Sequence, residues 1–376
     1  MSPAAVDFQK TPYLVIWETT QACDLICVHC RATAEPDPKP GELSHDEGLT
    51  LMDEVARMGT KVLILSGGDP LKRKDLLELV RHGKSRGLRL GTIPAATPLL
   101  AKEVVRQLKE AGLDQMALSL DGSTEESHDR FRGTAGAFQK TMEAARWARD
   151  IGLPLQINTV IARRNFHEVD ALMERVRSLG IVFWEIFFLV PVGRGAALEA
   201  LAAKEVETVF SKLYQLSKRE SFIIKITEAP HYRRYVLQEK MEEGTEPKKI
   251  RGRKFKLPIE LRRELGIRGS IGQPPQGVNA GKGFVFVAHD GEVFPSGFLP
   301  LSAGNVRDLP LGNIYRDSPL FVALRDPELL KGRCGVCEYR EVCGGSRSRA
   351  HALTGDYLAE DSTCCYQPLL HQNAGR

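Results

Sequence analysis

The stretch Cys23-Asp-Leu-Ile-Cys27-Val-His-Cys30 brings three cysteines together in one short segment near the start of the chain. Three thiolates at this C-x3-C-x2-C spacing can hold three irons of a 4Fe-4S cluster and leave the fourth iron without a protein ligand. An iron left open in this way can bind a small molecule and pass it an electron, which side chains alone cannot do. The stretch therefore predicts a redox enzyme.

The rest of the composition is that of an ordinary globular protein. The chain has 376 residues, 42% of them hydrophobic, and a formal net charge of +4. This length allows two domains, or one large α/β domain with an appendage. No apolar run approaches the roughly 18 residues of a membrane span, and residues 1–10 do not have the pattern of a signal peptide. We therefore expect a cytoplasmic protein that is not a dedicated nucleic-acid binder.

The eight cysteines fall into two groups, three near the start and five between Cys334 and Cys365. In a secreted protein such groups could form disulfides, but the expected compartment is reducing and the spacings are those of metal ligands. Both groups are therefore predicted to bind a metal or a cluster. Zinc is the alternative to iron–sulfur at either group.

Apolar strand-like segments alternate with amphipathic helical segments over the first 217 residues. The predicted strands are 13–17, 62–65, 88–93, 115–120, 155–160 and 183–190. The predicted helices are 46–58, 75–85, 102–111, 138–151, 167–179 and 203–217. Six successive β-α units indicate an α/β fold with a curved parallel sheet, a partial (β/α)6 TIM-like barrel, whose active site lies at the carboxyl ends of the strands. The first cysteine group directly follows the first strand.

The predicted domains follow from this alternation and from changes in composition. Residues 1–12 form a tail, 13–230 the partial barrel, 231–282 a basic linker or insertion, and 283–376 a small C-terminal domain. The Lys- and Arg-rich stretch 248–268 is predicted to be a solvated linker, and an RNA- or phosphate-binding arm is the alternative. Within the C-terminal domain, His289-Asp-Gly291 indicates a hairpin turn.

A second motif, Gly67-Gly68-Asp69-Pro70, follows the second strand. With the cysteine loop after the first strand, the chain resembles the radical S-adenosylmethionine (AdoMet) enzymes. This resemblance implies that the three cysteines hold the cluster and that the amino and carboxylate groups of AdoMet occupy the open iron. One electron, supplied by a flavodoxin- or ferredoxin-type donor, then cleaves AdoMet to a 5′-deoxyadenosyl radical that takes a hydrogen atom from the substrate.

The resemblance also implies the residues around the cofactor. His29 packs beside the cluster, where many members have an aromatic residue, and the Gly67–Pro70 motif approaches the methionine moiety, with Asp69 where glutamate is commoner. The other residues implied to contact AdoMet are Thr97, Ser119, Asp121, Asn158 and Val192. Glu18, on the first strand, is a candidate catalytic carboxylate and equally a candidate for an ordinary group of the barrel interior.

The second cysteine group has the pattern of a closed site with four thiolates, for zinc or a 4Fe-4S cluster. It resembles the SPASM or twitch extension of radical AdoMet enzymes. Ser296 and Ser346 stand at or near positions where a full SPASM domain has cysteines, so the resemblance implies one auxiliary 4Fe-4S cluster. Its implied ligands are Cys334, Cys337, Cys343 and either Cys364 or Cys365, with Cys364 preferred.

The C-terminal sequence motifs, such as Phe294-Pro-Ser-Gly-Phe298, resemble those of the heme-biosynthesis branch of these enzymes, which modifies porphyrin propionates. A guanidinium can form two parallel hydrogen bonds with one carboxylate, so arginines are the candidate propionate ligands. The candidates are Arg194, Arg233, Arg234, Arg347 and Arg349. A ribosomally synthesised peptide is the alternative substrate, and a zinc-bound RNA-binding protein is the alternative of another class.

Overall fold

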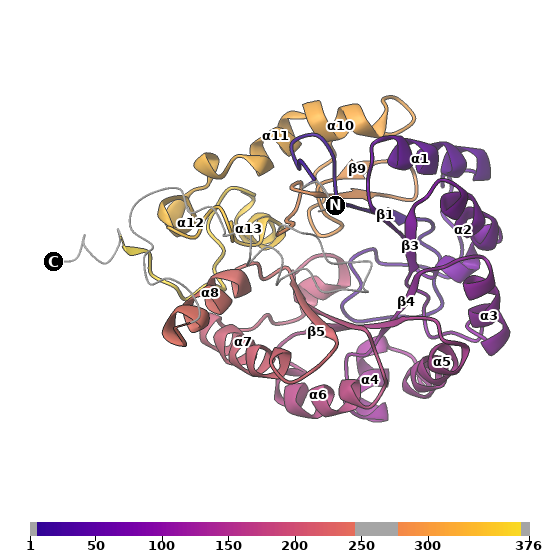
Figure 1. The fold of residues 1–376 in the computed structure, drawn as a ribbon, viewed down its shortest axis with the longest axis horizontal. Helices are drawn as coiled ribbons and strands as arrows, with labels where there is room; N and C mark the ends of the chain where they lie inside the picture. Colours follow the sequence, from indigo (N-terminus) through magenta and orange to yellow (C-terminus); the bar gives the residue numbers. More distant parts are fainter. Residues whose placement is uncertain (1–5, 245–276, 370–376) are drawn as a thin grey trace.

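The computed structural model of the chain describes residues 6–244 and 277–369. One sheet of nine strands has the order β7-β6-β5-β4-β3-β2-β1-β8-β9. All neighbouring pairs are parallel except β8 and β9. Figure 1 shows that this sheet curls and that helices α1 to α7 follow its outer side. The predicted α/β fold with a curled, partly closed barrel is confirmed.

Each predicted strand overlaps a strand of the sheet. The strands are β1 (Leu14–Glu18), β2 (Val62–Ser66), β3 (Arg89–Thr92), β4 (Gln115–Ser119), β5 (Leu155–Ile161), β6 (Phe183–Phe188), β7 (Ile223–Thr227), β8 (Phe284–Val287) and β9 (Val293–Phe294). The helices over the first strands are α1 (His45–Arg57), α2 (Leu76–Ser85), α3 (Lys102–Glu110), α4 (Glu125–Arg132), α5 (Ala137–Ile151), α6 (Val169–Arg177) and α7 (Ala203–Ser217). Strand β7 and helix α4 are additions to the prediction.

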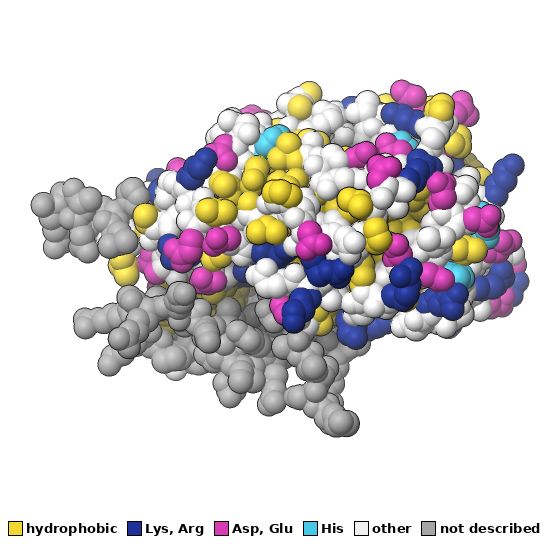
Figure 2. Space-filling view, turned by 90° about the horizontal axis from the view of Figure 1, so that it is seen from above, with side chains coloured by type: hydrophobic (Ala, Val, Ile, Leu, Met, Phe, Trp, Pro, Cys, Tyr) yellow, Lys and Arg dark blue, Asp and Glu magenta, His cyan; other side chains and the backbone are white. Residues whose placement is uncertain are grey.

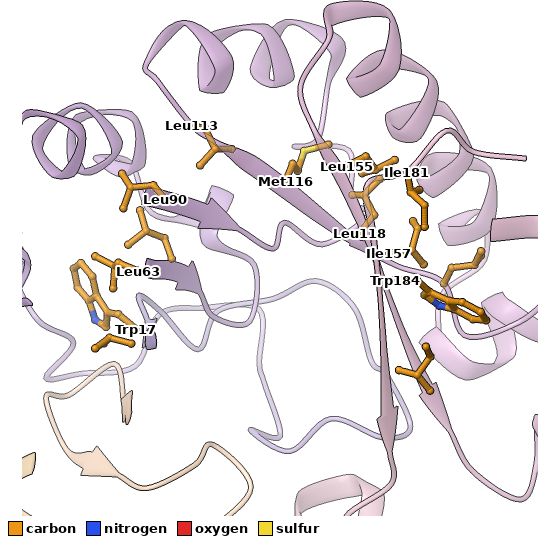
Figure 3. Packing of buried hydrophobic residues seen from close by; sticks show 14 of the residues in the cluster. Trp17, Leu63, Leu90, Leu113, Met116, Leu118, Leu155, Ile157, Ile181 and Trp184 are labelled. Atoms are coloured by element: carbon orange, nitrogen blue, oxygen red, sulfur yellow. The ribbon is translucent and has the colours of Figure 1, made fainter. Parts of the chain in front are cut away.

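The two faces of the sheet have different environments, because successive side chains of a strand point to opposite faces. Trp17, Leu63, Leu118, Ile157 and Trp184 point outward and are buried beneath the helices, as Figure 3 shows. The alternate residues of the same strands point inward and line a cavity. The outer face therefore holds the core, and the inner face remains available for a ligand.

The C-terminal part of the chain is joined to this sheet. Strand β8 pairs with β1 in parallel, with Leu14 opposite Phe284 and Trp17 opposite Val287. Tyr315 reinforces the junction, because its hydroxyl donates to the carbonyl of Phe8 at 2.6 Å and accepts from the N–H of Gly283 at 3.0 Å. The segment predicted as a separate domain from residue 283 thus supplies a neighbour to the first strand.

Part of the linker predicted for 231–282 is regular structure. Helix α8 (Tyr232–Glu242) begins at the start of that range and packs against α7. The basic stretch 248–268 lies outside the described residues. Further along, β8 and β9 form the predicted hairpin around the His289-Asp-Gly291 turn.

Short helices complete the C-terminal part. They are α10 (Leu311–Asp317), α11 (Pro319–Arg325), α12 (Gly332–Val336) and α13 (Arg347–Thr354). In Figure 1, α10 and α11 lie near β9, and α12 and α13 lie between α11 and α8. On the face in Figure 2, acidic and basic side chains are interspersed, in keeping with the small net charge. Among the described residues, no helix is long and apolar enough to cross a bilayer.

Candidate functional site

A cavity of about 320 Å³ lies against the inner face of the sheet. Side chains from β1 to β8 line it, together with the loop that carries the first cysteines and the loop after β2. The carboxyl ends of β2 and β4 contribute Ser66 and Ser119, so the cavity opens at the edge of the sheet where parallel α/β proteins bind ligands.

Cys23, Cys27 and Cys30 all line this cavity and form no disulfide. Their loop is held by backbone hydrogen bonds, from the N–H of Cys23 to the carbonyl of Glu35 at 2.7 Å and from the N–H of Cys30 to the carbonyl of Cys27 at 3.2 Å. The structure therefore brings the three thiols to one wall of one cavity, as the cluster requires.

Arg194, a candidate propionate ligand, instead fastens the cysteine loop. Its Nε donates to the carbonyl of Cys27 at 2.8 Å, and its backbone N–H donates to the carbonyl of Cys30 at 2.9 Å. Gly193 has a φ of +54°, and a Cβ there would lie 2.3 Å from the carbonyl oxygen of Arg31. The Gly193-Arg194 turn thus packs directly on the back of the loop.

Arg132, at the end of α4, supplies a positive charge beside the cysteines. Its Nη1 lies 3.2 Å from a carboxylate oxygen of Asp121 and 3.4 Å from Nε2 of His29. Burial raises the pKa of the Cys23 thiol to about 11, and Arg132 acts against this increase. An adjacent cation favours thiolates, so Arg132 supports the charge state in which cysteines bind metal.

His29 is neutral in this setting, because burial and the nearby Arg132 lower its pKa well below the ordinary value. Its ring centroid lies 4.8 Å from that of Phe131, and the residue lines the cavity. The position beside the cysteines agrees with the predicted packing role.

The glycine motif after β2 approaches the backbone of the cysteine segment too closely for side chains. A Cβ on Gly67 would lie 2.5 Å from the carbonyl oxygen of Thr20, and one on Gly68 would lie 2.5 Å from that of Ala22. Both glycines line the cavity. Glycine at these positions therefore brings backbone to the cavity wall.

Asp69, Pro70 and Thr97 are not among the lining residues. The Asp69 carboxylate is buried and accepts hydrogen bonds from the N–H of Ala95 at 3.2 Å and from the Thr97 hydroxyl at 3.0 Å. Pro70 begins a 3₁₀ turn capped by Asp69. Asp69 thus joins the loop after β2 to the loop after β3, and the contact of these three residues with the cofactor stays a prediction.

Ser119 and Asn158 do line the cavity and lie side by side on β4 and β5. Their row continues across the sheet, with Asn158 opposite Glu185 on β6 and Glu185 opposite Lys225 on β7. Glu185 accepts from Lys225 at 2.7 Å. Sequence reasoning missed Glu185 and Lys225, although a charged residue within the apolar run 183–188 is a signal for an inward-facing polar position.

Asp121 also lines the cavity, but Val192 does not. The Asp121 carboxylate is buried and accepts from the N–H of Val160 at 2.7 Å as well as from Arg132. Burial raises the pKa of Asp121, and Arg132 opposes the increase. In the loop after β6, Arg194 holds the cysteine loop, and the contact of Val192 with AdoMet stays a prediction.

Glu18 lies outside the lining, bonded to three neighbours. Arg31 donates to it at 2.8 Å, Gln21 donates at 3.2 Å, and Nδ1 of His289 lies 3.2 Å away. Burial alone would raise the pKa of Glu18, but Arg31 and the hydrogen bonds lower it to about 2. The carboxylate is therefore an anion that holds Arg31, and the guanidinium of Arg31 faces the cavity over the Phe286 ring, 4.2 Å from its centroid.

The second cysteine group surrounds a small separate cavity. Its lining includes Cys334, Cys337, Cys343 and Cys364, whereas Cys365 is exposed and is not part of it. Burial raises the pKa of all four lining thiols, that of Cys364 to about 11. Within the described ranges, no three His, Cys, Asp or Glu side chains are arranged to hold a single metal ion.

The two serines that replace expected cysteines converge on one carboxylate. Ser296 donates to Glu228 at 3.2 Å, Ser348 donates at 3.0 Å, and Ser346 donates to the other oxygen. Glu228 has a φ of +59°, an uncommon conformation for a residue with a side chain, and it lines the main cavity. A group of hydroxyls and a carboxylate occupies the place that the resemblance assigns to another cluster.

Of the remaining candidate arginines, Arg233 alone among the described residues lines the main cavity. Arg349 is buried and bonds Asp361 and the carbonyl of Phe188. Arg347 donates to the carbonyls of Tyr357 and Ala359, and Arg234 pairs with Glu207. These three stabilise the C-terminal part and its junction with the barrel.

Comparison with known proteins identifies the relatives of the chain. Residues 17–176 match the model of the radical SAM superfamily. The chain is 41% identical to the AdoMet-dependent heme synthase of Methanosarcina barkeri, over 96% of this chain and 98% of that protein. It is 30% identical to the Fe-coproporphyrin III synthase of the same organism, over 93% and 87%. It is 29% identical to the PqqA peptide cyclase of Rhodopseudomonas palustris, over 95% and 88%.

Solved structures with the same fold have lower sequence identity. Streptococcus suis SuiB bound to S-adenosylmethionine matches with a TM-score of 0.70 at 14% identity, over 95% of this chain and 78% of that chain. The enzyme anSMEcpe with bound AdoMet and a peptide matches with a TM-score of 0.64 at 18% identity, over 94% of both chains. The likeness therefore extends across the barrel and the C-terminal part.

Proposed function

This chain belongs to the radical SAM superfamily and to the family of the AdoMet-dependent heme synthases, and on that premise we propose that it modifies propionate side chains of a tetrapyrrole. The first cluster, when bound, supplies the electron that cleaves AdoMet to the radical that removes a hydrogen atom from the substrate. A flavodoxin- or ferredoxin-type protein in the cytoplasm delivers that electron.

Within this proposal, the chain's own residues prepare the cofactor site. Cys23, Cys27 and Cys30 hold the cluster, and Arg194 keeps their loop in place through its carbonyl contacts. Arg132 balances the negative charge of the thiolates. The backbone at Gly67 and Gly68, with Ser119, Asp121 and Asn158, forms the wall against which AdoMet lies.

The second cysteine cavity is the proposed site of one auxiliary 4Fe-4S cluster. Four half-buried thiols around one space fit a closed cluster with no open iron. The convergence of Ser296, Ser346 and Ser348 on Glu228 supports a count of one auxiliary cluster, because hydroxyls hydrogen-bonded to a carboxylate are not cluster ligands.

The main cavity supports the substrate assignment through its aromatic and cationic side chains. Phe187, Phe284, Phe286 and Phe298 line it, and the rings of Phe187 and Phe298 are 6.3 Å apart. Arg31, Lys225 and Arg233 face the same space. Flat apolar surface combined with cations suits a planar macrocycle that bears carboxylates.

A ribosomally synthesised peptide is the second candidate substrate. The 29% identity to a peptide cyclase and the fold of a peptide-bound enzyme support it. A peptide would place side chains rather than one flat ring system against the phenylalanines, so the two candidates predict different ligands for the same cavity.

Anaerobic incubation with AdoMet, dithionite and iron coproporphyrin III tests the proposal. We expect 5′-deoxyadenosine to form and the mass of the porphyrin to fall through loss of carboxyl groups. The Cys27→Ala variant is the control and should form neither product, because it loses a ligand of the first cluster. Cleavage of AdoMet by the wild type with an unchanged porphyrin would contradict the tetrapyrrole assignment and leave the peptide alternative.

Zinc analysis of the same preparation tests the alternative of another class. A radical enzyme with one auxiliary cluster contains about eight irons per chain. Colourless protein with stoichiometric zinc, inert toward AdoMet, would instead support the zinc-bound RNA-binding interpretation. In that case RNA binding should weaken steeply as salt is added.

A further inference from the structure

Among the described residues, seven charged side chains apart from the cysteines line the main cavity, and they divide into two groups. Asp121 and Arg132 pair with each other near the cysteines. The other members come from the position after Cys30, from β6 and β7, from the loop after β7, and from α8. They are Arg31, Glu185, Lys225, Glu228 and Arg233.

Four of these five are already tied to partners of opposite charge or to several donors. Arg31 pairs with Glu18 at 2.8 Å, and Lys225 pairs with Glu185 at 2.7 Å. Glu228 accepts hydrogen bonds from three serine hydroxyls. The charges of Arg31, Lys225 and Glu185 are therefore paired within the protein, and the Glu228 carboxylate is hydrogen-bonded to hydroxyls.

Arg233 differs from the other cavity-lining cations in its partners. Its Nη1 donates to the carbonyl of Val342 at 3.1 Å, and its Nη2 donates to the carbonyl of Val278. Within the described part of the chain, no carboxylate lies in ion-pair distance of this guanidinium, since both of its hydrogen-bond acceptors are neutral. A cation that is partly withdrawn from water and lacks an anion can gain strongly from a carboxylate ligand.

Lys225 lies on the same stretch of wall. It is the inward-facing residue of β7, and Arg233 follows in the first turn of α8, with Glu228 and Pro230 lining the cavity between them. Glu185, the partner of Lys225, also accepts from Thr227 at 2.6 Å and Gln156 at 3.0 Å. With these other donors on Glu185, the ammonium of Lys225 can share its remaining hydrogen bonds with a ligand.

We propose that Arg233, assisted by Lys225, binds a carboxylate of the substrate at the β7–α8 side of the cavity. The assignment rests on the proposed function, and it specifies which wall holds the acidic side chain. Arg31, 4.2 Å above the Phe286 ring, lines another part of the cavity and is already paired with Glu18.

This location also sets the substrate carboxylate beside the second cysteine site. Arg233 contacts the carbonyl of Val342, the residue before Cys343. Asn279, another lining residue, donates to the carbonyls of Cys343 and Gly345 at 3.2 and 3.1 Å. One thin layer of side chains thus separates the carboxylate pocket from the auxiliary cysteines, and the bound propionate lies between the two cysteine groups.

Binding without turnover tests the assignment. The anaerobically reconstituted enzyme, with AdoMet and without reductant, is titrated with coproporphyrin III, and the absorbance of the porphyrin reports binding. Arg233→Gln should raise the Kd by about ten-fold or more, because a charged hydrogen bond to carboxylate is lost. The Kd of Arg233→Lys should lie between that of Arg233→Gln and that of the wild type. Lys225→Gln should raise the Kd less than Arg233→Gln does.

Arg316→Gln is the matched control, since Arg316 is exposed on α10 and bonds Asn313 there. It should bind the porphyrin like the wild type. Iron content and AdoMet affinity of each variant show whether the sites remain intact. The tetramethyl ester of coproporphyrin III is a second measurement that needs no mutation, and it should bind to the wild type at least about ten-fold more weakly than the free acid.

The outcomes separate this assignment from the proposed function. Equal binding of acid and ester by the wild type, or wild-type affinity in Arg233→Gln with its clusters intact, would overturn the carboxylate site and leave the tetrapyrrole function standing. If Arg233→Gln loses iron, the carboxylate site is tested by the porphyrin Kd of Arg233→Lys and by the comparison of acid with ester in the wild type. A wild-type enzyme that binds neither porphyrin but binds a peptide would overturn the proposed function itself.

Discussion

At the scale of single residues, the Asp69 side chain links two loops by hydrogen bonds. Both of its carboxylate oxygens are in use, one on the N–H groups of Leu71 and Ala95 and the other on the Thr97 hydroxyl. Burial raises its pKa, and these hydrogen bonds oppose the increase. Aspartate, shorter than glutamate by one methylene, joins the loops after β2 and β3 while its own side chain stays out of the cavity.

Asp69→Asn should lower the free energy of unfolding by about 1 kcal/mol, because a neutral amide oxygen replaces the carboxylate as acceptor for the N–H groups of Leu71 and Ala95. Urea denaturation of the anaerobic protein measures this loss, and the affinity for AdoMet should fall with it. Asp308→Asn, at an exposed position, is the control and should change neither quantity. Equal stability of the two variants would contradict the role of Asp69 in linking the two loops.

Cys364 and Cys365 are adjacent in sequence but differ in environment, since Cys364 lines the auxiliary cavity and Cys365 is exposed. Cys365→Ser should retain about eight irons per chain, and Cys364→Ser should retain about four. Iron and sulfide analysis after anaerobic reconstitution distinguishes them. The reverse result would show that the exposed thiol is the fourth ligand.

His289 makes stability depend on pH through Glu18. Burial would lower the pKa of His289, but the hydrogen bond and charge of Glu18, with Asp290 and Glu42, raise it above 6.5. A raised pKa gives stability that is complete below the unfolded value and is lost as pH rises through the folded value. The melting temperature of wild type minus that of His289→Gln should therefore be larger at pH 6 than at pH 9.

The expected change in that difference is on the order of 1–3 °C for a chain of this size. Using the difference between two proteins removes the general effect of pH on the clusters, which both share. A difference that stays constant or grows from pH 6 to pH 9 would mean that His289 is not charged in the folded protein.

At the scale of elements, the loop after β2 and the segment after β1 fit together through backbone alone. The N–H of Gly68 donates to the carbonyl of Thr20 at 2.8 Å, and the N–H of Asp69 donates to that of Ala22 at 2.7 Å. Because the contact surface is backbone, any side chain at Gly68 forces the two segments apart. The cysteine loop and the glycine loop are therefore one unit.

Gly68→Ala should abolish AdoMet binding or weaken it by about ten-fold or more, because its Cβ would meet the carbonyls of Gln21 and Ala22 at 2.5 Å. Gly87→Ala is the control, since a Cβ on Gly87 would have nothing within 4 Å, although the φ of Gly87 is +78°. It should cost about 1 kcal/mol of stability and spare AdoMet. Equilibrium dialysis with labelled AdoMet measures both.

The six predicted strands could be recognised because each is apolar enough to be buried and is followed by a helix with its own periodicity. Strand β7 was missed, since Ile-Ile-Lys-Ile-Thr is short and follows a polar stretch. In the site, motif residues such as Cys23 and Gly68 were found from local spacing. Glu185, Lys225 and Arg233 were not assigned to one wall, because only the pairing of distant strands brings them together.

At the scale of the whole molecule, the barrel and the C-terminal part share one sheet. Strand β1 pairs with β2 on one side and β8 on the other. Arg307 adds a contact between the parts, because its guanidinium bonds Glu47 on α1 and the carbonyl of Gly41. The C-terminal part is thus a structural component of the barrel.

A chain that ends at residue 282 should consequently lose more than the second cysteine site. It leaves one edge of β1 unpaired, and exposed edges of apolar strands promote association. We expect this truncated chain to aggregate and to bind fewer than four irons, measured by gel filtration and iron analysis. A monomer with a full first cluster would show that the barrel folds without the C-terminal part. Cys337→Ser in the full chain is the control, because it alters only the second cysteine site.

The central place of β1 has a consequence for the order of events in the cell. The strand that carries the cysteine loop leaves the ribosome long before its partner, since β1 ends at Glu18 and β8 ends at Val287. At about 5–20 residues per second, the partner emerges roughly 15–50 s later. Pairing across such a separation is slow. During synthesis, the three cysteines are therefore presented on an incomplete sheet, and loading of iron and sulfide belongs to a finished or nearly finished chain.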